Sequence, residues 1–128
     1  MQITATSVAL TVDDVRASAT FLTEHFGFKE AMSADGFVSL GRAGAPHVIF
    51  LRRGLDVLPE GFRDRHAGGV ILAFTVADLE GEYRRLRDAG VAITLPLREE
   101  PWGERLFQVT DPNGVVVELL DWNASGDR

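Results

Sequence analysis

The sequence contains one short segment twice. Residues 8–15 (VALTVDDV) return as residues 72–79 (LAFTVADL), so that residue 8 matches residue 72. Each copy reads as a strand that leads into an aspartate, which can accept hydrogen bonds from the first turn of a helix. An amphipathic run follows each copy and ends near Gly27 or Gly90, because glycine readily adopts the left-handed conformation found at helix ends. A repeat of about half the chain predicts two similar modules.

Apolar residues recur at three- to four-residue intervals in both amphipathic runs, which predicts one buried face on each helix. Asp13 or Asp14 is the expected cap of the first helix, and Asp78 is the expected cap of the second. The apolar positions are Val15, Ala19, Leu22 and Phe26 in the first run and Leu79, Tyr83, Leu86 and Ala89 in the second.

Three further strands are expected after each helix, because apolar runs alternate there with turn-forming sequences. They are predicted over residues 29–32, 37–40 and 47–52 in the first half and over residues 93–95, 106–110 and 115–120 in the second. The unit is therefore strand, helix and three strands. We expect a single domain over 1–128, with module 1 at about 1–52, a connecting arm at about 53–69 that could also cover a cleft, and module 2 at about 70–122.

The composition excludes several classes of protein. Of the 128 residues, 45% are hydrophobic and 25% are charged, which is typical of a globular domain, and no apolar stretch is long enough to span a bilayer. The formal net charge of -6 opposes binding to nucleic acid. The chain has no cysteine, which excludes disulfides and thiolate metal sites, and its first residues lack a secretory pattern. We therefore expect a cytoplasmic protein that binds neither nucleic acid nor membrane.

Residues 107–119 (FQVTDPNGVVVEL), the preceding Pro101-Trp102-Gly103 and the two strand-to-helix repeats resemble the vicinal oxygen chelate superfamily, also called the glyoxalase/bleomycin resistance/dioxygenase group. The resemblance covers nearly the whole chain. It implies an α+β fold in which two tandem βαβββ modules each curl a four-stranded sheet, and the two sheets form an eight-stranded cleft. Such a cleft is often completed by a second subunit, so a homodimer is expected.

The resemblance also locates four positions at which members of this family hold a divalent metal. They fall on Ser7, about Phe50, Ile71 and Glu118. Isoleucine and phenylalanine have no lone pair, and a neutral serine hydroxyl is a poor donor, so Glu118 alone would leave an ion mostly hydrated. None of the three histidines occupies a matching position. We therefore expect no metal and no other cofactor.

Aromatic side chains on or beside the strands that line the family's cleft are the candidate ligand contacts, because flat rings stack on flat ligands. Trp102 either plugs the mouth of the cleft or meets a ligand, and the phenylalanines could equally be core residues. Glu118 is a polar anchor, a former metal ligand that pairs with an arginine such as Arg105, or a structural carboxylate. The expected ligand-binding residues are Trp102, Phe37, Phe50, Phe107, Ser7, Ile71 and Glu118.

Together these features favour a binding protein resembling the metal-free bleomycin-resistance branch, which sequesters an aromatic or apolar natural product such as an antibiotic. Sequestration requires affinity and no chemistry. The alternative is an enzyme of natural-product metabolism in the same family, an isomerase, epimerase or lyase, with Glu118 as base or metal ligand. A structural module without a small ligand is a third possibility. Phe62 and Trp122 are candidate dimer contacts.

Overall fold

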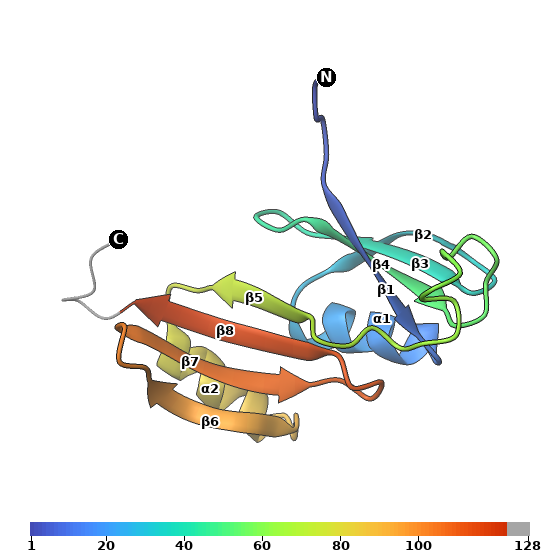
Figure 1. Cartoon of the computed structure of the whole chain (residues 1–128). Coiled ribbons are helices and arrows are strands. Elements are labelled where there is room, and N and C mark those ends of the chain that lie inside the picture. The colour runs from blue at the N-terminus through green and yellow to red at the C-terminus, as the bar shows by residue number, and fades with distance from the viewer. Residues whose placement is uncertain (123–128) are drawn as a thin grey trace. The chain divides into compact units, whose positions relative to one another are not determined.

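The computed structural model describes residues 1–122. The chain divides into two compact units, Met1–Gly69 and Val70–Arg128, which are called module 1 and module 2 below and are described separately. Each module contains one helix and one four-stranded mixed sheet, in the order strand, helix, three strands (Figure 1). The prediction of an α+β chain with two tandem βαβββ modules is confirmed.

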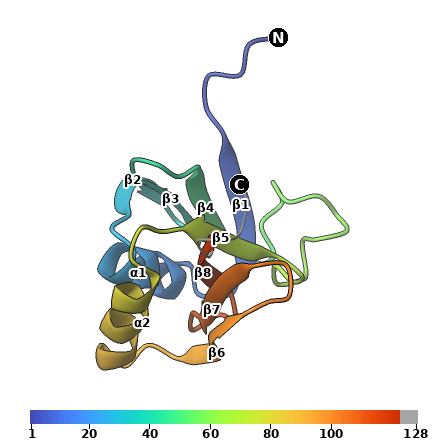
Figure 2. The same ribbon diagram turned by 90° about the vertical axis from the view of Figure 1, so that its left-hand side faces the viewer.

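Module 1 is built from β1 (Ser7–Val12), α1 (Val15–His25), β2 (Lys29–Ala34), β3 (Phe37–Gly41) and β4 (His47–Arg52). The strand order in the sheet is β1-β4-β3-β2, with β1 and β4 parallel and the other neighbours antiparallel. The helix packs against β2, β3 and β4 on one side of this sheet (Figure 2).

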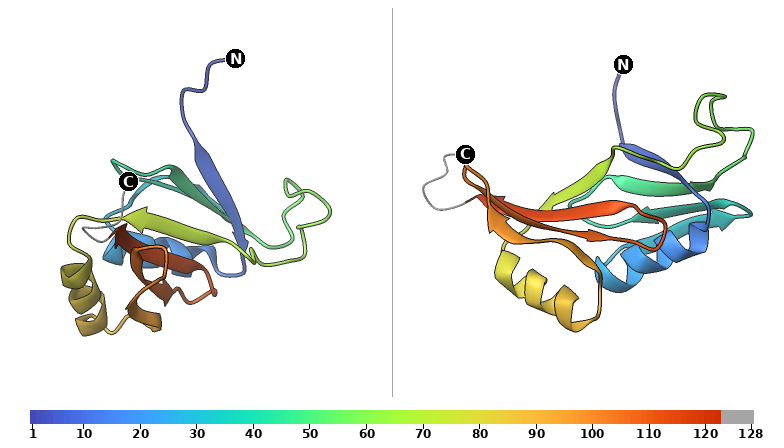
Figure 3. Two further views of the ribbon diagram at one scale, coloured as in Figure 1. Left: turned by 60° about the vertical axis from the view of Figure 1, so that its left-hand side comes forward. Right: turned by 60° about the horizontal axis from the view of Figure 1, so that its bottom comes forward.

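Module 2 repeats this plan with β5 (Ile71–Thr75), α2 (Leu79–Asp88), β6 (Ile93–Glu99), β7 (Glu104–Thr110) and β8 (Val116–Trp122). Its strand order is β5-β8-β7-β6, again with one parallel pair, β5 and β8. The helix α2 lies against one side of this sheet and contacts β6 and β8 (Figure 3). The matching topology explains the sequence repeat.

The repeated aspartates cap the helices as their spacing predicts. Asp14, rather than Asp13, accepts a hydrogen bond from the backbone N–H of Ala17 at 3.1 Å, and Asp78 accepts one from Gly81 at 3.1 Å. These carboxylates satisfy N–H groups that have no partner within the helix. At the other end of each helix, Gly27 and Gly90 have the positive φ values of 71° and 79° that end the helix.

Side chains alternate across each strand, so every sheet has one helix-covered face and one face turned away from its own helix, here called the helix-free face. In module 1 the buried residues of the helix-covered face include Leu10, Val12, Val38, Leu40, Val48 and Phe50. In module 2 the corresponding residues include Leu72, Phe107, Val109, Val117 and Leu119. Burial of these apolar faces supplies most of the favourable free energy of folding in each module.

The strands β6 and β7 are longer than the sequence predicts. They extend to Glu99 and begin at Glu104, and the turn between them contains Trp102. Pro96 and the charged residues after it obscured the strand, because proline cannot donate a ladder hydrogen bond. The structure accommodates Pro96 on the edge strand β6, where the pairing with β7 is irregular between Leu95 and Arg98.

The connecting arm, residues 53–69, is folded and attached to module 1 (Figure 3). Ala67 donates a backbone hydrogen bond to Thr11 on β1 at 2.7 Å. Asp13, just after β1, pairs with Arg53 at 2.8 Å and with His66 at 2.5 Å. Within residues 1–122, no helix is long and apolar enough to cross a membrane.

Candidate functional site

Glu118 lies in the middle of β8 on the helix-free face of module 2. The sheet register places it beside Ala73 of β5 and Gln108 of β7. The Gln108 side-chain Nε2 donates a hydrogen bond to Glu118 Oε1 at 2.9 Å. Only 9% of the Glu118 surface is exposed, which is unusual for a carboxylate. Its central place on a strand and its low exposure make it the most distinctive polar group on this face.

Two further carboxyl groups lie near Glu118. Burial is the largest cause that raises the pKa of the Glu118 carboxyl, and a hydrogen bond and negative charge from Glu104 and the charge of Glu100 raise the pKa further. The hydrogen bond from Gln108 acts in the opposite direction, because it stabilises the charged form. Glu118 therefore keeps its proton to a higher pH than an ordinary glutamate.

Trp102 lies at the turn between β6 and β7. Its side chain is largely exposed, at 64%, and its Nε1 donates a hydrogen bond to Glu104 Oε1 at 2.9 Å. The indole is thus held beside Glu104, which lies on the same face of the sheet as Glu118. Sequence reasoning identified Trp102 and Glu118 but missed Glu104 and Gln108. Gln108 could have been found by pairing the predicted strands 106–110 and 115–120 across the turn between them, which sets it opposite Glu118.

The arginine suggested as a partner for Glu118 has other partners. Arg105 lies on the helix side of β7, where its guanidinium pairs with Glu80 of α2 and Asp121 of β8 at 2.5 Å each. Asp121 and Glu80 raise the pKa of Arg105, in that order of importance, so it stays charged. Arg105 thus joins α2 to the sheet through ion pairs. The residue that hydrogen-bonds to Glu118 is Gln108, whereas the sequence suggested Arg105. Arg98 of β6 lies on the helix-free side of the sheet, opposite Leu106, and pairs with Glu100 at 2.5 Å.

The strand register of module 1 shifts one predicted site residue. Ala9 pairs with Ile49 as Ala73 pairs with Glu118, so Ile49 is the counterpart of Glu118. Phe50, the position expected from the sequence, is 0% exposed and lies on the helix-covered face. A shift of one residue moves a side chain to the opposite face of a strand, so Phe50 is a core residue.

Phe107 is likewise placed in the core of module 2. It is 0% exposed, and its ring meets the edge of Tyr83 on α2 with 4.9 Å between centroids. The other predicted residues lie on helix-free faces: Phe37 is half-buried on β3, Ser7 is exposed at the start of β1, and Ile71 is 49% exposed at the start of β5. Phe37 pairs with Leu51 of β4, which is the neighbour of the buried Phe50. Because adjacent residues point to opposite faces, Phe37 lies on the helix-free face.

The four positions of the expected metal site do not supply a metal-binding donor set. Ser7, Ile49, Ile71 and Glu118 offer one neutral hydroxyl, two hydrocarbon chains and one carboxyl group. A divalent cation needs several oxygen or nitrogen donors. Among residues 1–122 there is also no group of three or more His, Cys, Asp or Glu side chains placed to hold a metal ion. These residues do not fit the metal that the family resemblance implies.

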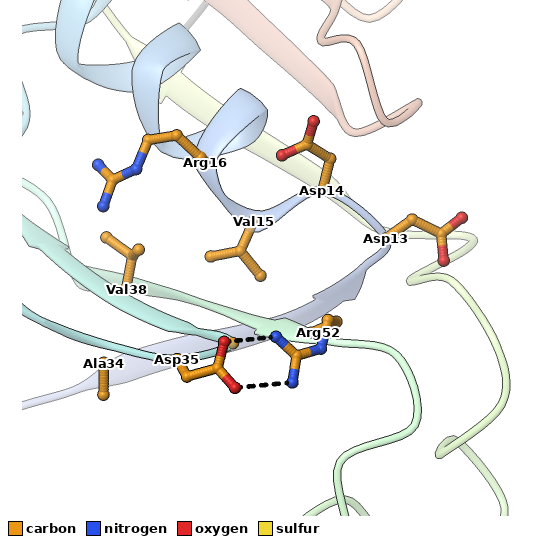
Figure 4. A pocket seen from close by; sticks show the side chains of 9 residues that line it. Asp13, Asp14, Val15, Arg16, Ala34, Asp35, Val38 and Arg52 are labelled. Atoms are coloured by element: carbon orange, nitrogen blue, oxygen red, sulfur yellow. Dashed lines mark hydrogen bonds and ion pairs between the residues drawn. The ribbon is translucent and has the colours of Figure 1, made fainter.

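A separate pocket of about 340 Å³ lies in module 1 beside the N-terminal end of α1 (Figure 4). Val15 and Val38 contribute apolar lining, and Arg52 forms two hydrogen bonds with Asp35 at 3.0 and 3.2 Å. The remaining lining residues are Asp13, Asp14, Arg16, Ala34 and Gly36. The pocket contains none of the residues predicted for ligand binding. Its charged groups pair with neighbouring side chains or the α1 backbone, so we do not assign a ligand to it.

Comparison with known proteins identifies the relatives of the chain. The model of the Glyoxalase/Bleomycin resistance protein/Dioxygenase superfamily matches residues 4–119. A search of curated proteins found no match. Among solved structures, a glyoxalase/bleomycin resistance protein/dioxygenase from Nocardioides is 23% identical with a TM-score of 0.81, covering 99% of this chain and 88% of that one.

Two further solved structures are similar in fold to this chain. TioX from Micromonospora sp. ML1 is 25% identical with a TM-score of 0.71, covering 94% of this chain and 100% of that one. A lactoylglutathione lyase from Agrobacterium tumefaciens is 19% identical with a TM-score of 0.72, covering 94% of this chain and 95% of that one. Since one of these neighbours is named as an enzyme, the fold by itself does not decide between binding and catalysis.

Proposed function

Because the chain belongs to the glyoxalase/bleomycin resistance protein/dioxygenase superfamily, we propose that it binds a small molecule on the helix-free face of module 2 without using a metal ion. The ligand is an aromatic or apolar natural product, such as an antibiotic, which the protein withholds from its target. This function requires a surface of suitable shape and chemistry and no reaction step.

The observation that carries this proposal is that the positions where the family resemblance implies metal ligands hold side chains that bind metal ions poorly or not at all. Three of the four positions, Ser7, Ile49 and Ile71, offer a hydroxyl and two hydrocarbon side chains, and Ile71 is 49% exposed. Exposed apolar side chains lose unfavourable contact with water when a ligand covers them. On module 2, Ile71 therefore favours contact with an apolar ligand at a position where the family resemblance implies a metal donor.

Trp102 and Glu118 supply the remaining chemistry of the proposed site. The exposed indole offers a flat surface for stacking, and the buried carboxyl group offers a directed hydrogen bond. Pockets for small molecules commonly combine apolar contacts with a few polar groups that orient the ligand. Phe37 lies on the helix-free face of module 1, whereas Phe50 and Phe107 are core residues.

The test is a thermal-shift screen of antibiotics and related aromatic natural products, followed by calorimetry on the compounds that stabilise the protein. Trp102→Ala is expected to raise Kd about tenfold or more, because buried aromatic contacts dominate many binding sites. The increase should exceed that for Glu118→Ala. Ile3→Ala is the control, since Ile3 is also an exposed apolar residue, at 70%, but precedes β1 in module 1. Equal affinities in wild type and Trp102→Ala would reject the proposal.

An enzyme that transfers a proton is the second candidate, and the raised pKa of Glu118 favours it. A carboxyl group with a raised pKa holds its proton more firmly and is a stronger base once ionised, which suits it to proton transfer. Ligands from the screen would be incubated with the protein and analysed by mass spectrometry and by NMR for isomers. A product that forms with wild type and not with Glu118→Gln would replace sequestration with catalysis as the function.

We further propose that the protein acts as a homodimer, because exposed apolar side chains are frequent at subunit contacts. Phe62 and Val57 of the arm are 57% and 70% exposed. Sedimentation velocity of wild type and of the double variant Phe62→Ser, Val57→Ser tests this. A monomer at all concentrations for wild type would reject the dimer without affecting the ligand proposal.

A further inference from the structure

The strand β5 runs along one side of Glu118. The sheet register pairs Ala73 with Glu118, and Ile71 and Thr75 lie two residues to either side of Ala73 on the same helix-free face. All three of these β5 residues are exposed. They are called the β5 strip below. The strip presents an apolar chain, a methyl group and a hydroxyl group in a row beside the carboxyl group.

The other side of Glu118 is occupied by Gln108 of β7, which is its partner in the antiparallel register. Gln108 Nε2 donates a hydrogen bond to Glu118 Oε1 at 2.9 Å. The next pair on this face, Leu106 and Leu120, is 5% and 7% exposed and has no polar side-chain atom. Glu118 therefore has a hydrogen-bonding neighbour on the β7 side and a methyl group directly beside it on the β5 side.

The size of the Ala73 side chain determines access to Glu118 from β5. Neighbouring strands lie about 4.8 Å apart, so a ligand atom resting on the Ala73 methyl group comes close to the Glu118 side chain. A larger side chain in place of Ala73 would occupy this space. Once ionised, a carboxyl group only accepts hydrogen bonds, so the ligand atom that meets it must carry a donor.

We infer that Ala73 is a specificity-determining residue, because its methyl group lets a flat ligand lie on the β5 strip with a hydrogen-bond donor directed at Glu118, and that Gln108 is the positioning residue that holds the carboxyl group there. The inference rests on the proposed function and names the class of ligand, an aromatic compound with a hydroxyl or amino group on its ring. Ile71 supplies an apolar contact for the ring. A compound of the same shape without the donor loses the hydrogen bond to Glu118.

Module 1 contains a matched control for this arrangement. Ala9 of β1 is exposed and pairs with Ile49 of β4 as Ala73 pairs with Glu118. Both alanines thus occupy the same place in their sheets, but only Ala73 has a carboxyl group beside it. Exposed substitutions usually change stability little, so Ala9→Leu and Ala73→Leu should both fold.

The first experiment follows the Glu118 side-chain carboxyl carbon by NMR as pH is varied in the full unliganded chain. Gln108→Met removes the amide donor but keeps a side chain of similar length. It should raise the pKa of Glu118 further, because the hydrogen bond from Gln108 stabilises the charged form. Gln2→Met is the control that removes an amide from an exposed site before β1. An unchanged Glu118 titration in Gln108→Met would overturn the positioning role.

The second experiment measures binding of 2-naphthol and 2-methoxynaphthalene to the full chain by calorimetry at about pH 8, well above the ordinary glutamate pKa. 2-Naphthol, which alone of the two has a donor, should bind about tenfold more tightly, and Gln108→Met should reduce this preference. Ala73→Leu should weaken binding of 2-naphthol about tenfold or more, because leucine covers the space beside Glu118, whereas Ala9→Leu should change it less than about twofold. Ala73→Val should act in the same direction, and it replaces Ala73→Leu if circular dichroism shows that variant to be unfolded.

Unchanged binding of 2-naphthol in the Ala73 variants would overturn the role of Ala73, and equal affinities of wild type for the two probes would overturn the preference for a donor. If neither probe binds wild type at about millimolar concentration, the inferred class of ligand is wrong. The screen of natural products decides the proposed function separately. A compound from that screen that Trp102→Ala binds more weakly, and that Ala73→Leu binds as wild type does, would retain the proposed function and overturn the role of Ala73.

Discussion

Replacement of Phe107 tests whether the ring belongs to the core or to the ligand site. The ring is 0% exposed and packs edge-on against Tyr83, with 75° between the ring planes. Phe107→Ala removes a fully buried ring and should lower the free energy of unfolding by about 3–5 kcal/mol. About 0.5–1.5 kcal/mol of this loss belongs to the aromatic contact. Phe107→Leu keeps an apolar side chain and should cost less than about 1.5 kcal/mol, since it retains most of the packing.

The assay is urea unfolding followed by circular dichroism, combined with calorimetry at temperatures where each variant is folded. Phe50→Ala is the matched control in module 1, because Phe50 is also 0% exposed. Trp102→Ala should change the unfolding free energy by less than about 0.5 kcal/mol, as exposed substitutions usually do. A loss below about 1 kcal/mol in Phe107→Ala, or weakening of ligand binding equal to that in Trp102→Ala, would refute the assignment of Phe107 to the core.

Two further predictions concern proton linkage and a tight turn. The pKa of Glu118 is raised in the folded protein. Above the ordinary glutamate pKa, the folded state therefore binds more protons than the unfolded state. The free energy of unfolding consequently falls as the pH rises from the ordinary glutamate pKa to the pKa of Glu118 in the folded protein. Glu118→Gln should flatten this decline in urea unfolding measured across pH. Gly36 and Gly44 both have positive φ, 73° and 84°, but only at Gly36 would an added Cβ lie 3.0 Å from the Arg52 guanidinium carbon. Gly36→Ala should therefore destabilise the protein more than Gly44→Ala, and equal losses in thermal unfolding would contradict the contact argument.

The features that the sequence predicts correctly are local or repeated. The aspartate caps, the glycines after both helices and the succession of helices and strands along the chain depend on short stretches of sequence. The duplication strengthened each of these interpretations, because the same pattern had to suit Asp14 and Asp78. The ends of β6 and β7 were missed because Pro96 and neighbouring charges mask a strand whose pairing is formed with residues further along the chain.

The candidate site was predicted less completely because it depends on which side chains meet across strands. Gln108 was passed over although the register places it directly opposite Glu118. Glu104 lies in a segment that was not recognised as strand, so its place on the same face as Glu118 could not be inferred. Arg105 was offered as a partner for Glu118, but its odd-numbered place on β7 turns it to the helix side, where Glu80 and Asp121 meet it.

The register of β4 leads to a last prediction, which compares two adjacent residues. Ile49 is half-buried on the helix-free face, and Phe50 is fully buried between the sheet and α1. In Ile49→Glu the carboxylate can stay in contact with water, so the free energy of unfolding should fall by less than about 2 kcal/mol. Phe50→Glu loses the ring and buries a charge, with a combined cost of at least about 5 kcal/mol, which approaches the whole stability of a small domain. Urea unfolding should show a folded Ile49→Glu variant and an unfolded or strongly destabilised Phe50→Glu variant. If the order were reversed, Phe50 would face away from α1, and the placement of Ile49 as the counterpart of Glu118 would be lost with it.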